Sequence, residues 1–182
     1  MQQFASNETY ASARSRTIAA HGRKCRETSE RKMECTVSWT GQSGTRSGMG
    51  FVAETGSGHV IAMDGAPDAA KPENGGQNLA PRPMETVLAG TGGCTAYDVV
   101  LILKRGRHDV RGCSVKLTSE RAEADPKVFT RIHMHFTVTG KGISAQAIER
   151  AIAMSHDKYC SASIMLGKTA EITTSFESVE VA

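Results

Sequence analysis

The sequence predicts an α+β fold, in which strands and helices occur in groups rather than in strict alternation. Two stretches with apolar residues at helical spacing begin near Pro83 and Ser144. Short segments with the period of two that is typical of strands precede, separate and follow these stretches. The resulting order is three strands, a helix, two strands, helices and a strand, which favours the α+β class over repeated βαβ units.

The chain of 182 residues suits one domain, which we place at residues 33–182. Residues 1–32 carry seven Lys or Arg against three Glu, a net +4, so the remainder carries −1 of the total +3. We interpret residues 1–32 as a basic leader that is disordered or precedes the native start at Met33. A transit peptide is the alternative, against which the glutamates argue. A nearly neutral domain disfavours a nucleic-acid partner.

Three strands are expected at the start of the domain. Apolar residues alternate at Val37 and Trp39 in the first strand and from Met49 to Ala53 in the second, and the third is HVIAMDG. The Gly- and Ser-rich segment ETGSGH forms a turn in this antiparallel meander. Residues 66–82 contain three prolines and two glycines, which predict a long loop.

A long helix is expected from Pro83, since proline is favoured in the first helical turn. Apolar residues recur at helical spacing as far as Leu103 and also occupy most other faces, which predicts a central, buried helix. Lys104, Arg105 and Gly106 then form an ordinary C-terminal signature.

Two strands follow, over residues 113–117 and 128–138. In the second, alternation places Val128 and Thr130 on the inward face together with Ile132 to Val138, and it places Phe129 on the opposite face with His133 and His135.

A second helix is expected after Ser144, which is a suitable N-cap, and Cys160 lies at its end. A short helix over residues 161–166 stops at Gly167, and a last strand runs from Ile172 to Phe176.

Five cysteines are present and none forms a CxxC motif, which excludes a zinc ribbon and a thioredoxin motif. Cys94 and Cys160 both lie in helical contexts. If the fold brings the two sulfurs close together, one thiolate can attack an oxidant and the other can resolve the resulting sulfenic acid as a disulfide. The alternative is that each is a small buried hydrophobe, as Cys113 is expected to be.

Gly90, Gly92 and Gly93 precede Cys94 within the helical pattern. Each glycine costs about 1 kcal/mol of helix propensity relative to alanine. Glycines at these positions are explained if another helix or a substrate approaches closely, or if the helix has a kink that places N–H groups near the sulfur.

His133 and His135 have a spacing that can chelate a metal, but no third ligand is recognisable, so we expect no metal site. The glycine-rich segments fit neither a phosphate loop nor a dinucleotide fingerprint, and no cofactor is expected. The longest apolar run, Val99 to Leu103, is too short to span a membrane. Without an export signal, reduced thiols in the cytoplasm are expected.

Three segments resemble the OsmC/Ohr family of osmotically inducible and organic-hydroperoxide-resistance proteins, and within it the YhfA-like branch: PMETVLAGTGGCTAYDVVLILKRGRHDV, VKLTSERAEADPKVFTRIHMHFTVTG and DKYCSASIML. The resemblance begins near Val37 and implies antiparallel sheets around two central helices in an intertwined homodimer. It also implies that Cys94 is the peroxidatic cysteine and Cys160 the resolving one.

This sequence matches the family at the two cysteines, but it matches less well at the residues that activate them. The hydroperoxidases have a glutamate directly after the proline that opens the helix, whereas Met84 stands there and Glu85 follows it. A shift of one residue turns a helical side chain by about 100°. In one branch of the family the activating arginine lies on the third strand, at a position that Ala62 occupies here. Arg46 and Arg82 are the remaining candidates for this role, and they are weaker candidates than the two cysteines.

The resemblance implies a cytoplasmic, thiol-dependent peroxidase that reduces organic hydroperoxides in the oxidative stress response. Its partners would be a second copy of the chain and a dithiol reductant. Two alternatives stay open, namely a non-catalytic dimer that binds a hydrophobic small molecule in an apolar cleft near Cys94, and a redox sensor.

Overall fold

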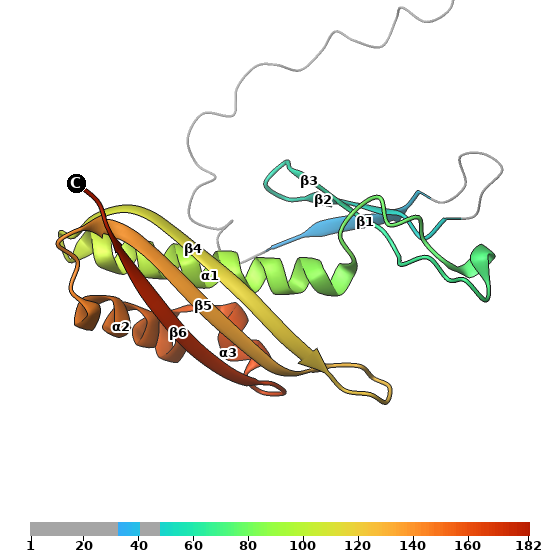
Figure 1. The fold of residues 1–182 in the computed structure, drawn as a ribbon. Helices are drawn as coiled ribbons and strands as arrows, with labels where there is room; N and C mark the ends of the chain where they lie inside the picture. Colours follow the sequence, from blue (N-terminus) through green and yellow to red (C-terminus); the bar gives the residue numbers. More distant parts are fainter. Residues whose placement is uncertain (1–32, 41–47) are drawn as a thin grey trace, which may run out of the picture.

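A computed structural model of the chain describes residues 33–40 and 48–182. The proposed leader, residues 1–32, and Arg46 lie outside the described residues. In the first sheet, β1 (Cys35–Trp39), β2 (Phe51–Thr55) and β3 (Val60–Met63) are antiparallel neighbours in that order, as the sequence predicts. This sheet stands beside the N-terminal end of the long helix, away from the rest of the fold (Figure 1).

The loop that follows β3 is tied down by Asp64, whose carboxylate is buried. It accepts hydrogen bonds from the backbone N–H groups of Gly65 at 2.7 Å and of Gln77 and Leu79 at 3.0 Å each. A single 3₁₀ turn (Pro72–Asn74) interrupts the loop. The Asp64 carboxylate, together with backbone hydrogen bonds, therefore holds the predicted long loop before the chain enters α1 (Pro83–Arg105).

The second sheet has the order β4 (Asp109–Arg121), β5 (Phe129–Lys141) and β6 (Glu171–Glu180). Strands β4 and β5 are antiparallel, as expected for this fold, but β6 pairs with β5 in parallel. The parallel pairing arises because a helical crossover joins the two strands. The crossover consists of α2 (Ala145–Met154), a π-helical turn (Ser155–Tyr159) and α3 (Ser161–Leu166).

The core lies between this sheet and the helices α1 and α2. Strand β5 contributes the largest share, since Ile132, Met134, Phe136 and Val138 are all at most 1% exposed. Ser144 caps α2 as predicted, because its side chain accepts a hydrogen bond from the Ala147 N–H.

The start of β5 departs from the predicted alternation. Phe129 is buried and Val128 is 39% exposed, so the expected inward positions of Val128 and Thr130 were wrong. Glu120 pairs with Arg131 and Arg121 pairs with Phe129, which leaves Thr130 as an extra residue in a β-bulge. The extra residue reverses the alternation of faces.

Helix α1 is central but only partly buried within one chain. Thr91, Thr95 and Val99 face the core, whereas Val87 and Tyr97 are 43% and 69% exposed. Over an 18-residue window its mean hydropathy is 1.5, so α1 is long and apolar enough to cross a membrane by length and composition alone. Core helices share these properties. The absence of a membrane partner therefore stays a prediction.

Candidate functional site

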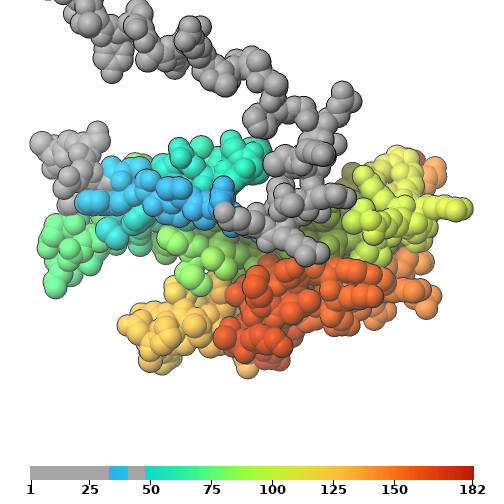
Figure 2. Space-filling model, turned by 180° about the vertical axis from the view of Figure 1, so that it is seen from behind, coloured from blue at the N-terminus to red at the C-terminus, as the bar shows by residue number. Residues whose placement is uncertain are grey.

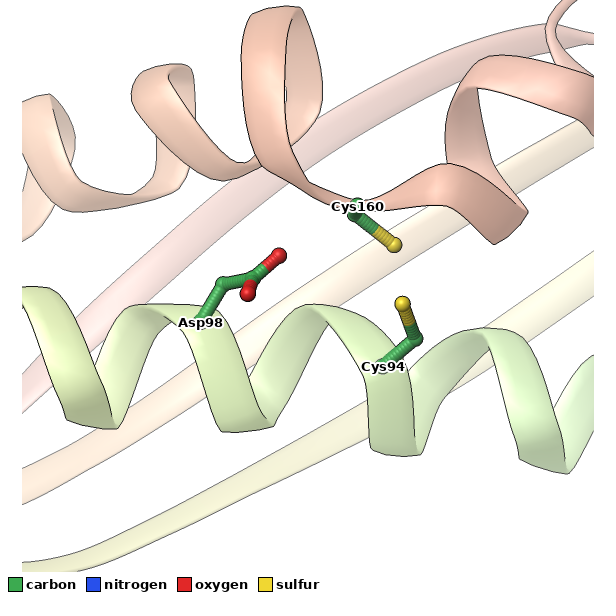
Figure 3. Close-up of side chains that lie close together, drawn as sticks. All are labelled: Cys94, Asp98 and Cys160. Carbon is green, nitrogen blue, oxygen red and sulfur yellow. The ribbon is translucent and has the colours of Figure 1, made fainter. Parts of the chain in front are cut away.

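Two cysteines that are far apart in sequence meet between α1 and the crossover. The sulfurs of Cys94 and Cys160 and a carboxylate oxygen of Asp98 all lie within 4.8 Å of one another. Figure 3 shows the three side chains pointing toward one another across the gap between the two segments. Cys94 is half-buried, Cys160 is fully buried, and both are unbonded. The structure thus meets the geometric condition for a two-cysteine mechanism.

A break in the crossover positions Cys160. The π-helical turn ends there, the backbone of Cys160 is extended (φ −75°, ψ 97°), and α3 starts at the next residue. Cys160 is therefore the N-cap of α3, and its Sγ accepts a hydrogen bond from the Ser163 N–H at 3.4 Å. Serine, threonine, aspartate and asparagine usually fill this position, so the sulfur replaces an oxygen acceptor.

Thr95 links α1 to Cys160. Its hydroxyl oxygen lies 3.3 Å from Cys160 Sγ and donates to the Thr91 carbonyl at 2.9 Å. A hydroxyl has one hydrogen to donate. When that hydrogen goes to the carbonyl, the Cys160 thiol can donate to the oxygen; when Cys160 is a thiolate, the hydroxyl can turn and donate to sulfur. Thr95 therefore suits both protonation states.

Asp98 lies one helical turn beyond Cys94 and so shares its face of α1. The Ser155 hydroxyl, at the start of the π-helical turn, donates to its Oδ2 at 3.1 Å. Sequence reasoning missed Asp98, Thr95 and Ser155. The i, i+4 spacing from Cys94 to Asp98 was the available signal.

The two thiols differ in acidity. Burial raises the pKa of Cys94, and a hydrogen bond with Cys160 and the charge of Asp98 raise it further. Burial also raises the pKa of Cys160, but hydrogen bonds from Ser163, Thr95 and Cys94 outweigh this effect and lower it overall. The hydrogen bonds at Cys160 therefore favour a thiolate there, although Cys94 is the more accessible sulfur.

The other candidates from the sequence lie elsewhere. Glu85 accepts a hydrogen bond from the Arg82 N–H at 2.9 Å and so caps the start of α1. Cys94 is nine positions after Glu85, which is about 13.5 Å along a helix axis. Both Glu85 and Arg82 are exposed, and Arg46 lies outside the described residues. Lys158, two residues before Cys160 in sequence, places its ammonium 5.4 Å from the centroid of the Tyr159 ring.

Two groups of side chains bear on metal binding. His133 and His135 both lie within 2.9 Å of the Ser175 hydroxyl, and within the described part of the chain they belong to no group of three ligands. Cys94, Asp98 and Cys160 do form such a group. Two sulfurs and one carboxylate are a donor set that suits zinc.

A cavity of about 590 Å³ lies between α1 and α2 and reaches Asp98. Leu101, Met154 and Tyr159 are among its lining residues. It is large enough for a small organic molecule. The cavity therefore reaches the site at Asp98, and neither Cys94 nor Cys160 is among its lining residues.

The three glycines before Cys94 differ in their surroundings. A Cβ at Gly92 would lie 2.5 Å from a methyl carbon of Leu117, so this glycine allows α1 to approach β4. A Cβ at Gly90 or Gly93 would meet no atom within 4 Å. The close approach at Gly92 is to a strand, and not to the other helix or the substrate that the sequence pattern suggested.

Comparison with known proteins places the chain in a family. Residues 75–175 match the family described as OsmC-like protein. The chain is 47% identical to Protein YhfA of Escherichia coli K12 over 147 residues, which are 81% of this chain and 98% of that protein.

Solved structures with lower identity share the fold. A crystal structure of an OsmC-like protein from Mycoplasma pneumoniae has a TM-score of 0.66 at 15% identity, over 83% of this chain and 99% of that one. An organic hydroperoxide resistance protein from Legionella pneumophila has a TM-score of 0.55 at 18% identity, over 82% and 97%. The match of the family over residues 75–175 and the identity to YhfA show that this chain belongs to the OsmC-like family.

Proposed function

We propose that this protein reduces organic hydroperoxides with the thiols of Cys94 and Cys160. The observation that carries the proposal is the meeting of the two sulfurs, together with Asp98, within 4.8 Å. Membership of the OsmC-like family supports it, as does the fold shared with the Legionella organic hydroperoxide resistance protein.

In the proposed reaction, the Cys94 thiolate attacks the terminal oxygen of the hydroperoxide. The O–O bond breaks, the departing alkoxide takes a proton to become an alcohol, and Cys94 becomes a sulfenic acid. The Cys160 sulfur then attacks the Cys94 sulfur, which forms the disulfide and releases water. A dithiol reductant restores both thiols.

Accessibility assigns the attack to Cys94, whereas the lowered pKa of Cys160 favours its role in the reductive step. Cys94 is the sulfur that a peroxide can reach, since Cys160 is fully buried. When the reductant attacks the disulfide at Cys94, Cys160 departs as the thiolate, and a leaving thiol with a lower pKa departs faster. The raised pKa of Cys94 keeps its thiolate fraction small near neutral pH, so we expect a slower enzyme than the founding hydroperoxidases.

The active form is proposed to be an intertwined homodimer in the cytoplasm, formed by residues 33–182. Apolar side chains of the first sheet are exposed within one chain, with Trp39 at 52% and Val60 at 65%. Tyr97 is exposed on α1, beside Gly90 and Gly93 on the same side of the helix. Figure 2 shows the first sheet as a separate layer along one side of the chain. A second copy would cover these surfaces.

The test is consumption of cumene hydroperoxide by the full chain in the presence of a dithiol and a metal chelator. We expect turnover by the wild type, none by Cys94→Ser, and loss of most turnover in Cys160→Ser. Cys113→Ser is the matched control, because Cys113 packs against the core away from the pair. Equal turnover in Cys94→Ser and the wild type would contradict the proposal.

A second candidate function is binding of a hydrophobic small molecule, which the cavity of about 590 Å³ beside Asp98 favours. Native mass spectrometry of the purified protein would detect a retained ligand. Retention without peroxide turnover would favour this function. A disulfide that forms under peroxide without turnover would favour a redox sensor.

A further inference from the structure

Asp98 has an unusual position for a carboxylate. It is half-buried beside two thiols, and the Ser155 hydroxyl donates its one side-chain hydrogen bond among the described residues. Within the same part of the chain, no Lys or Arg forms an ion pair with it. Three groups that can bind a metal cation therefore face one another in the reduced site.

We propose that the reduced protein binds Zn²⁺ through the sulfurs of Cys94 and Cys160 and a carboxylate oxygen of Asp98, with water in the fourth position. Sulfur ligands lie about 2.3 Å from zinc and oxygen ligands about 2.0–2.2 Å, so neighbouring donors in a tetrahedron are about 3.3–3.8 Å apart. The three donor atoms already lie within 4.8 Å of one another. Side-chain rotations that move the donor atoms by about 1 Å would therefore complete the site.

The surrounding hydrogen bonds resemble those that orient metal ligands. The Ser155 hydroxyl holds Asp98 from one side. The Ser163 N–H donates to the Cys160 sulfur, and the Thr95 hydroxyl lies 3.3 Å from it. Such partners fix ligands in place, and their loss typically costs 10–100-fold in metal affinity.

The donor set selects the metal. Thiolates are poor ligands for Mg²⁺ and Ca²⁺, which require several oxygens, and Cu(I) prefers sulfur alone. Two thiolates, a carboxylate and one open position fit Zn²⁺.

If the proposed peroxidase chemistry holds, zinc binding and disulfide formation exclude each other, because both use the same sulfurs. Two zinc-bound thiolates, one hydroperoxide and two protons give the disulfide, one alcohol, one water and free Zn²⁺. The sulfurs are oxidised, the O–O bond is reduced, and zinc keeps its charge. The metal would thus protect the thiols until a peroxide displaces it.

The experiment titrates Co²⁺, a spectroscopic substitute for Zn²⁺, into reduced, chelator-treated full-length protein. We expect a thiolate-to-cobalt charge-transfer band in the near ultraviolet that saturates at one equivalent per chain and disappears when Zn²⁺ is added. Cys160→Ser should lose the band, and Asp98→Asn, which keeps the shape but removes the charge, should weaken binding at least tenfold. Cys113→Ser and Cys35→Ser should bind like the wild type.

The absence of a band in the wild type would overturn the proposal. So would an affinity unchanged in Asp98→Asn, or a band that Cys113→Ser or Cys35→Ser abolishes. Peroxide turnover is measured on metal-free protein, so failure of zinc binding leaves the proposed peroxidase function untouched. Failure of turnover likewise leaves the cobalt result intact.

Discussion

Replacement of Gly93 by alanine tests whether a second chain covers the exposed side of α1. Within one chain, a Cβ at Gly93 or Gly90 meets no atom within 4 Å. If that side faces water, the only effect of Gly93→Ala is the gain in helix propensity, about 0.8–1 kcal/mol. For a chain of this size, 1 kcal/mol raises the melting temperature by about 2–4 °C.

If a second chain packs closely against this side of α1, Gly93→Ala is destabilising instead of stabilising. A methyl group forced into a packed helix surface costs about 1–3 kcal/mol, which leaves a net loss of up to about 2 kcal/mol after the helix-propensity gain. The helix-propensity gain is the same in the folded monomer and in the dimer, so the steric cost alone, up to about 3 kcal/mol, would raise the dimer dissociation constant by up to about 150-fold. We therefore expect Gly93→Ala to weaken the dimer and to lower the melting temperature at low protein concentration.

The assay combines sedimentation velocity with thermal unfolding at two protein concentrations. Gly90→Ala is the parallel variant. Gly92→Ala is the control within the chain, since its Cβ would displace Leu117 whether or not a partner is present. A rise of about 2–4 °C in both Gly90→Ala and Gly93→Ala, with the wild type sedimenting as a monomer, would refute the proposed homodimer.

Three further outcomes are expected. The hydrogen bond from the Leu79 N–H, with those from Gly65 and Gln77, holds the pKa of Asp64 below its usual value despite the opposing effect of burial. Because the folded pKa is depressed, the stabilisation is present above the unfolded pKa of about 3.9 and is lost as pH falls through the folded value. The melting temperature of the wild type should therefore be higher than that of Asp64→Asn near pH 6, and the difference should disappear toward about pH 2. A difference that stays constant with pH would contradict this role of Asp64. A chain that starts at Met33 should keep the fold, the dimer and thiol reactivity, and a melting temperature lower by many degrees would show that residues 1–32 stabilise the domain. Phe136→Ala should lose about 3–5 kcal/mol in urea unfolding, because Phe136 is fully buried, whereas a loss below about 1 kcal/mol would mean that the core is assigned wrongly.

Most elements were predictable because their signals are local. Proline at the first turn and Gly106 after the last fix the ends of α1, and Ser144 marks the start of α2. Alternation identified the inward residues from Ile132 to Val138. Each signal depends on neighbours in sequence, so no tertiary information was required.

The errors and omissions depend on contacts between distant segments. The bulge at Thr130 follows from the register between β4 and β5, and the parallel pairing of β6 follows from the crossover. Asp98 becomes part of the site only because the π-helical turn brings Ser155 and Cys160 against α1. A sequence pattern could indicate that Cys94 and Cys160 were reactive candidates, but it could not indicate which polar groups surround them.

The most direct test of the central proposal is the identity of the bond formed after one equivalent of organic hydroperoxide is added to reduced, chelator-treated protein. We predict an intact mass lower by two hydrogens and a peptide map in which Cys94 is joined to Cys160 of the same subunit. Cys160→Ser should instead trap a sulfenic acid on Cys94. A disulfide between Cys94 and Cys113, or a Cys94 that stays reduced, would contradict the two-cysteine mechanism.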